Sequence, residues 1–420
     1  MVLLLLFAVG FTTATRYLPN PGAFYAYITA GLGKTIGLGS SFLAVAGYFL
    51  MAVGTYAFFG LAGKSVMEPI LHGPQLPWQL YSFTCLAVVG TFGYFRIDLS
   101  AKLLSIAMIA ECLMVGIFDA GVLIKGGPEG RSFTFFDFGG VSVGSLGIAV
   151  LFAATCFLGF EATAIFREET KDPKRTVTRA TYLAVTAIGL FYVVAAWLII
   201  GGYGVKNATD LAGTDPTGMF PSAVEHFVGV WASDVVSVLV MTSAFAAVLA
   251  VQNIMSRYCY SLGVDGVLPA ALGRVHPRHG SPYLSSLTVS GALAVAVLLV
   301  SGSDPAAIYG QLCGTGGFAV LVLMFLTGIA VVLFFRRRPD INDSTRWHTV
   351  IAPLLGTIAF GAVLYLAVTN FTTLTGGSMT VAVILQLIVW SVFLAGVVLA
   401  RIYRAKRPGT YARIGRQQLN

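Results

Sequence analysis

The sequence predicts an all-α, polytopic membrane protein, and three observations carry that prediction. Of its 420 residues, 57% are hydrophobic and 10% are charged, and the mean hydropathy is +0.83. A soluble globular domain carries about 25% charged residues. Windows of about 20 apolar residues, the length that crosses the hydrocarbon core of a bilayer, recur along the whole chain. The connections between them are short and leave no room for a separate soluble domain.

Eleven membrane spans are expected, with edges placed only to within a few residues. They cover residues 1–17, 39–63, 80–95, 103–124, 146–166, 180–203, 230–259, 283–301, 306–335, 349–370 and 379–402. The first has no basic region before its apolar run and no small-residue cleavage motif near Arg16 and Tyr17, so it is predicted to be a membrane helix and not a signal peptide. The five cysteines lie in apolar stretches without a CxxC pair, which indicates neither a disulfide framework nor a zinc site.

The positions of Lys and Arg predict the orientation of the chain. One alternating set of loops and ends holds 22 of the 26 basic residues, and the other set holds Lys64, Lys125, Arg131 and Lys206. The basic set, including the tail after Arg401, is therefore expected in the cytoplasm at the lipid surface. This placement explains the net charge of +8 without a nucleic-acid partner. It also puts Met1 outside the cell, from which we expect that one preceding helix is absent from this chain.

The span 146–166 is the most informative element. It is interrupted at Gly159-Phe160-Glu161 and then runs into a charged segment that extends from Arg167 to Arg175. A carboxylate inside a membrane span is costly and is usually functional. Broken membrane helices mark substrate sites in secondary transporters, because an opened turn exposes backbone groups that bind a polar solute. If residues 154–159 unwind, the positive end of the following half-helix favours a carboxylate.

Four sequence runs together resemble a known family. The first is Gly159-Phe160-Glu161 with Glu168-Glu169, Asp172-Pro173-Lys174-Arg175 and Arg179-Ala180-Thr181. The second is Asn253, Ser256-Arg257, Tyr260, Asp265-Gly266, Leu268-Pro269, His276-Pro277 and Ser281-Pro282. The others are Pro21-Gly22-Ala23-Phe24-Tyr25-Ala26-Tyr27 and Ser100-Ala101-Lys102. In combination they are similar to the signatures of the amino acid/polyamine/organocation (APC) transporter superfamily, over essentially the whole chain.

The resemblance implies two inverted five-helix repeats and two extra helices in a single transmembrane domain over residues 1–420. Residues 1–124 would be the remainder of the first repeat, 146–301 the second repeat, 306–402 the two extra helices and 403–420 a cytoplasmic basic tail. Family helix one, which supplies half of the site for the substrate's carboxylate, would be missing. Two explanations stay open: a gene start set too far downstream, or a remnant that cannot transport.

The resemblance also assigns candidate substrate-binding residues. The break would run from Ala154 to Gly159, and the side chains of Thr155, Cys156 and Phe157 would line the pocket. The alternative for these three side chains is ordinary helix packing. Glu161 is predicted either to gate the cytoplasmic half or to cap the backbone donors freed at the break.

Glu111 is a second carboxylate inside a predicted span. It stands where some relatives carry a lysine in place of a sodium ion, and it is a candidate for proton coupling. The alternative is a structural hydrogen bond to a neighbouring helix. The segment from Phe245 to Val251 is nearly all apolar, which favours proton coupling or exchange over sodium coupling.

Other functional classes are disfavoured by what the sequence lacks. All five histidines lie in predicted loops or at helix ends, so no intramembrane metal site or histidine-based catalytic centre is expected. No phosphate-binding GxxxxGK[ST] motif indicates an ATP-driven pump. We therefore expect no enzyme and no cofactor, but a multi-pass carrier in the plasma membrane that moves an amino acid or a related amine by alternating access. The alternative is a truncated, non-transporting family remnant or membrane partner protein; a channel, without a ring of charges, is a weaker third.

Overall fold

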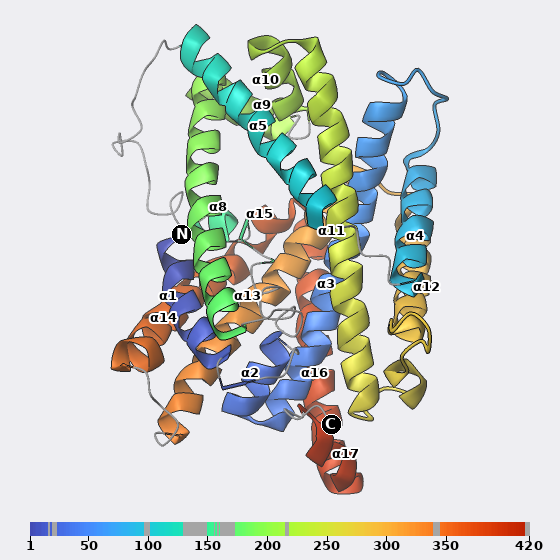
Figure 1. Cartoon of the computed structure of the whole chain (residues 1–420), viewed down its shortest axis with the longest axis vertical. Coiled ribbons are helices and arrows are strands. Elements are labelled where there is room, and N and C mark those ends of the chain that lie inside the picture. Colours follow the sequence, from blue (N-terminus) through green and yellow to red (C-terminus); the bar gives the residue numbers. More distant parts are fainter. Residues whose placement is uncertain are drawn as a thin grey trace.

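The computed structural model describes residues 1–15, 17–18, 23–95, 101–128, 149–154, 156–157, 159, 173–214, 218–338 and 345–415. Over these ranges the chain is almost wholly helical, and the described residues include no β-strand. This confirms the predicted all-α architecture. Figure 1 shows a bundle of long helices with shorter helices at both ends.

The helices follow one another along the whole chain. Their bounds are α1 (Val2–Thr15), α2 (Ala23–Leu32), α3 (Lys34–Met67), α4 (Trp78–Phe95), α5 (Ala101–Lys125), α8 (Pro173–Tyr203), α9 (Val205–Thr214), α10 (Met219–Phe227), α11 (Val230–Val264), α12 (Tyr283–Val300), α13 (Pro305–Arg337), α14 (Ala352–Thr369), α15 (Phe371–Thr375), α16 (Met379–Lys406) and α17 (Pro408–Arg413). A short 3-10 helix, η3 (Ala270–Gly273), follows α11, and a π-helical turn, η5 (Trp347–Ile351), leads into α14.

Eight of these helices are long and apolar enough to cross a membrane. They are α3, α5, α8, α11, α12, α13, α14 with its π-helical turn, and α16, and each coincides with a predicted span. The predicted spans 1–17 and 80–95 correspond to the shorter helices α1, of 14 residues, and α4, of 18 residues. Only part of the predicted span 146–166 lies within the described residues. The chain is therefore a multi-pass membrane protein.

Helix α3 is the centre of the main bundle. It packs against α4, α11, α13 and α16, and the largest core cluster gathers side chains from all of them. Small residues bring α3 close to α13: a Cβ on Gly316 would lie 2.5 Å from the carbonyl oxygen of Gly47. Because such contact has no room for a side chain, the glycines of α13 serve helix packing, as interfaces between membrane helices require.

A second, smaller core joins α5, α8, α10 and α11 at one side of the bundle. Phe118 of α5 is fully buried there, with its ring 5.3 Å from that of Phe220 and 6.0 Å from that of Phe227. Val224 of α10 and Val236 of α11 complete the contact. This cluster holds α8 beside the bundle, where it reaches the interrupted segment described below.

One end of the molecule carries α2, α17 and the last turns of α11, α13 and α16 (Figure 1, lower end). Its described basic side chains include Lys34, Arg337, Arg404, Arg407 and Arg413, and we call it the basic end. The opposite end carries the connection from α3 to α4 and the short helices α9 and α10. The charge asymmetry predicted from the sequence thus separates the two ends of the bundle.

Candidate functional site

Residues 149–154 are helical, and Cys156 and Phe157 lie in a turn. The amide of Cys156 donates to the Phe152 carbonyl at 3.1 Å, and the amide of Phe157 donates to the Ala154 carbonyl at 3.4 Å. Gly159 then takes φ +108°, in the left-handed region that favours glycine. The helix therefore stops within the segment that the sequence predicts to be unwound.

The predicted binding residues differ in their exposure. Ala154 and Phe157 are buried, with 7% and 8% of their surface accessible, whereas Cys156 and Gly159 are exposed. Thr155 and Glu161, the other two candidates of this segment, lie outside the described residues. Of the three predicted pocket side chains, Cys156 is thus the one that the structure shows to be accessible.

Two pairs of aromatic rings lie in the region of Cys156. Phe157, the next residue in the chain, makes an edge contact with Tyr192 of α8, with 5.9 Å between ring centroids. In the second pair, Tyr309 of α13 stacks on Phe58 of α3 at 4.6 Å. Cys156 lies within electrostatic range of both tyrosines. We call Phe58, Phe157, Tyr192 and Tyr309 the aromatic wall.

A small polar cluster supports the aromatic wall between α3 and α13. The hydroxyl of Thr55 donates to the Met51 carbonyl at 2.8 Å and lies 3.8 Å from the Cys313 sulfur. The Cys313 thiol also donates to the Met51 carbonyl, at 3.6 Å. These contacts join the two helices one turn away from Phe58 and Tyr309, so these two rings of the wall stand on rigid helices, whereas Phe157 lies in a turn.

The wall suits an organic solute with an apolar or cationic part. Aromatic faces bury apolar groups, and their negative potential attracts ammonium groups within about 6 Å of the ring centre. Sequence reasoning missed Phe58, Tyr192 and Tyr309, because no local motif marks them and only the folded bundle brings them to Cys156.

Glu111 lies on α5, half-buried, and faces α11. The hydroxyl of Ser243 on α11 hydrogen-bonds with its carboxylate. This contact is compatible with the expected structural bond to a neighbouring helix, and both interpretations of Glu111 stay predictions. Glu111 remains partly accessible, so its carboxylate can still take up and release a proton.

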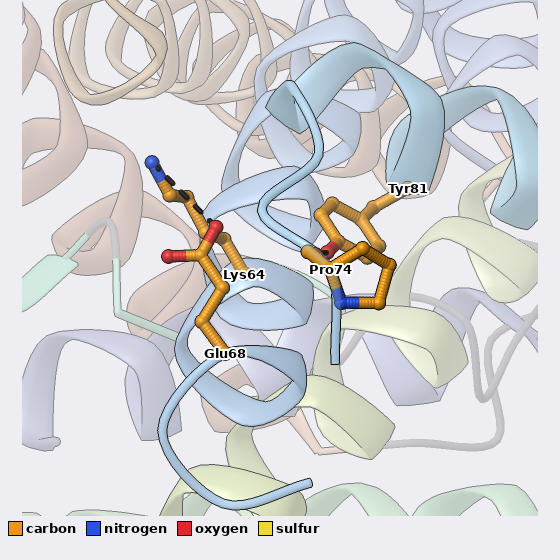
Figure 2. A network of polar contacts seen from close by, with 4 residues as sticks. All are labelled: Lys64, Glu68, Pro74 and Tyr81. Carbon is orange, nitrogen blue, oxygen red and sulfur yellow. Dashed lines mark hydrogen bonds and ion pairs between the residues drawn. The ribbon is translucent and has the colours of Figure 1, made fainter. Parts of the chain in front are cut away.

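The C-terminal end of α3 holds a charged surface site that is separate from the aromatic wall. Lys64 and Glu68 form an ion pair at 3.8 Å, and nearby the Tyr81 hydroxyl donates to the Pro74 carbonyl at 3.5 Å (Figure 2). The pair borders an open depression of about 580 Å³. Exposed pairs of this kind contribute about 0–1 kcal/mol. Among the described residues, no group of three or more His, Cys, Asp and Glu side chains could hold a metal ion.

The comparison with protein families is decisive for the class of this protein. The family model described as amino acid permease matches residues 1–393. The chain belongs to the amino acid permease family. This confirms the resemblance to the APC superfamily predicted from the sequence.

Proteins similar to this chain have names that state different transported compounds. The chain is 25% identical over 351 residues to the branched-chain amino acid permease BcaP of Bacillus subtilis (strain 168), covering 80% of this chain and 71% of that protein. It is 22% identical over 372 residues to the low-affinity putrescine importer PlaP of Escherichia coli (strain K12), covering 86% and 78%. It is 24% identical over 321 residues to the gamma-aminobutyric acid permease of Escherichia coli (strain K12), covering 73% and 65%.

A solved structure also aligns along the chain. It is a manganese transporter from Eremococcus coleocola, 13% identical, with a TM-score of 0.44 over 99% of this chain and 96% of that one.

Proposed function

We propose that this protein is a secondary carrier of an amino acid or a related amine in the plasma membrane. The observation that carries the proposal is the amino acid permease match over residues 1–393. The relatives named above are permeases or importers of a branched-chain amino acid, putrescine and gamma-aminobutyric acid. These solutes share an amino group on a small aliphatic body, which fits the chemistry of the aromatic wall.

The substrate site is the interrupted segment with the wall that flanks it. Ala154, Thr155, Cys156, Phe157 and Gly159 contribute the backbone and side chains of the break, as the resemblance implies. Transport then proceeds by alternating access, in which helices rock around a site at the middle of the membrane. Two such states need differ by only a few kcal/mol for substrate to shift their populations.

Protons or a counter-transported solute drive the carrier in this proposal. Glu111 is the coupling group, since its carboxylate lies partly accessible inside a membrane-spanning helix. Glu161 stays a candidate for gating. The basic end, with the C-terminus, faces the cytoplasm, because Lys and Arg concentrate on the cytoplasmic side of membrane proteins.

Uptake by the purified protein in sealed liposomes tests the proposal. Labelled leucine, gamma-aminobutyrate and putrescine are offered with and without a pH gradient, acid outside, and with and without unlabelled solute inside. We expect saturable uptake of at least one compound, competed by an excess of the unlabelled form and accelerated by the gradient or by internal solute. Sealed liposomes with folded protein that accumulate none of them above protein-free liposomes would contradict the proposal.

A further inference from the structure

The C-terminal segment folds back onto the basic end of the bundle. After α16, the short helix α17 lies at the lower end of the bundle (Figure 1), and Gly415 beyond it reaches α2 through a hydrogen bond to Tyr25. Ile414 is buried, with 1% of its surface accessible. A terminus that buries an apolar side chain is tied to the fold and is not a solvated tail.

Three groups meet at a buried hydrogen-bonded centre in this region. The Tyr25 hydroxyl of α2 donates to Asp265 Oδ2, just after α11, at 2.9 Å. The Gly415 amide donates to the Tyr25 hydroxyl at 2.7 Å and lies 3.2 Å from the same Asp265 oxygen. Tyr25 and Asp265 are buried, at 2% and 7% accessible surface. Buried, charge-assisted bonds are stronger than exposed neutral ones.

The backbone at Gly415 fits this centre closely. Its φ is +68°, and a Cβ there would lie 2.5 Å from a carbon of Thr29 on α2. Residues other than glycine rarely adopt this φ, and no side chain has room at this point. The packing of this segment against α2 therefore requires glycine at position 415, whose amide donates to Tyr25.

Further contacts attach the segment to the start of α3 and the end of α11. Lys34 donates to the Ala412 carbonyl, and the Thr35 and Tyr411 hydroxyls are 3.1 Å apart. The Tyr403 hydroxyl, near the end of α16, donates to the Val267 carbonyl at 3.2 Å. The neighbouring helices α2 and α3 thus meet the end of α11, which is far from them in the sequence, on one short segment.

We infer that residues 407–415 act as a clasp that holds α2, the start of α3 and the end of α11 together, with Tyr25 and Asp265 as positioning residues for the transport cycle. Helix α2 follows α1 in the chain, and it is also bound to α13, because Arg337 donates to the Gly31 carbonyl at 2.8 Å. Movement of α2 relative to the end of α11 must therefore strain the clasp or release it. This role in the cycle rests on the proposed function, whereas the clasp itself is tested without any substrate.

Hydrogen exchange and thiol labelling of the full-length protein test the inference. Tyr25→Phe removes the donor to Asp265, and Gly415→Ala introduces a Cβ against Thr29. We expect each variant to speed amide exchange over residues 411–415 at least about fivefold, with exchange in α3 unchanged, since local opening needs no global unfolding. We also expect maleimide labelling of Cys156 to rise at least about threefold relative to Cys112, an exposed cysteine on α5, because freer helices open the site more often.

Matched controls are present in the same chain. Tyr81→Phe removes a hydroxyl at the opposite end of the molecule, and Gly409→Ala adds a Cβ where no atom of the described residues lies within 4 Å. Both should behave as the wild type does. Unchanged exchange over residues 411–415 in Tyr25→Phe and Gly415→Ala would overturn the clasp. Faster exchange with unchanged Cys156 labelling would overturn its role in opening the site, whether or not a transported substrate has been found.

Discussion

The Tyr25 side chain is held in its neutral form by its position. Burial first, and then the charge of Asp265, raises the pKa of Tyr25 well above its ordinary value of about 10. When an acid has a higher pKa in the folded protein than in the unfolded chain, its contribution to folding stability is complete below the unfolded-state pKa. That contribution is lost as the pH rises toward the folded-state pKa. The Tyr25 hydroxyl therefore stays protonated and donates to Asp265 throughout the physiological pH range.

We predict that wild type is more stable than Tyr25→Phe by a constant amount between pH 7 and about pH 10, and that this difference shrinks at higher pH. Thermal unfolding in detergent over this range measures the difference. Tyrosinate absorbance gives an independent check. If Tyr25 ionised together with the exposed tyrosines, at about pH 10, its surroundings would not hold it neutral.

The two interpretations of Glu111, proton coupling and a structural hydrogen bond, can be tested separately, because Ser243 can be changed while Glu111 is kept. Glu111→Gln removes the ionisable group but keeps a side chain that can bond to Ser243, whereas Ser243→Ala removes the hydroxyl and keeps the carboxylate. We predict that Glu111→Gln loses the acceleration of uptake by a proton gradient, by about tenfold or more, the size expected for loss of an essential proton carrier. Ser243→Ala should keep it. If both variants respond to the gradient as the wild type does, the bond is structural only.

Some residues of the candidate site could be predicted from the sequence, and others could not. Cys156 and Phe157 were predicted through the resemblance of the neighbouring run Gly159-Phe160-Glu161 to a family signature, which is local in the chain. Phe58, Tyr192 and Tyr309 sit in ordinary apolar helices, and a single aromatic residue there has no distinguishing neighbour. Their association comes from the packing of α3, α8 and α13, which periodicity does not encode.

At the scale of the helix, α3 and α13 are in close backbone contact. The Gly47 carbonyl oxygen lies 2.5 Å from the position of a Cβ at residue 316, and backbone cannot move aside as a flexible side chain can. We predict that Gly316→Ala lowers the free energy of unfolding by about 1–3 kcal/mol, the usual cost of overpacking.

Gly291→Ala on α12 is the matched control for this prediction, because no atom of the described residues lies within 4 Å of a Cβ there. It should be neutral or stabilising by up to about 1 kcal/mol, the helix-propensity difference between alanine and glycine. Thermal unfolding in the same detergent compares the two variants. Equal stability of both would contradict the close contact.

The long helices were predictable and the short ones were not. A run of about 20 apolar residues has one stable solution in a bilayer, a helix that satisfies its own backbone. The helices α2, α9 and α10 have 10, 10 and 9 residues, below the length at which a helix is stable by itself. Helices α2 and α10 form because the bundle covers them, as the buried face of Val224 and Phe227 in α10 illustrates.

At the scale of the whole molecule, charge separates the two ends. Lys34, Arg404 and Arg407 lie at the basic end, whereas the last turn of α3, at the opposite end, carries Lys64 paired with Glu68. Because orientation depends on where basic residues concentrate, we predict that the C-terminus is in the cytoplasm. A C-terminal tag should resist protease in intact cells and be cleaved in inverted vesicles, and cleavage in intact cells would reverse the orientation.

The central claim is that a transported solute occupies the interrupted segment beside the aromatic wall. Protection of Cys156 against a maleimide tests it most directly, with Cys112 as the reference thiol in the same molecule. The account predicts that a compound taken up by the liposomes slows labelling of Cys156 with the same half-saturation as its uptake, and leaves Cys112 unchanged. Saturable uptake with no protection of Cys156 at any concentration would place the substrate elsewhere and contradict the account.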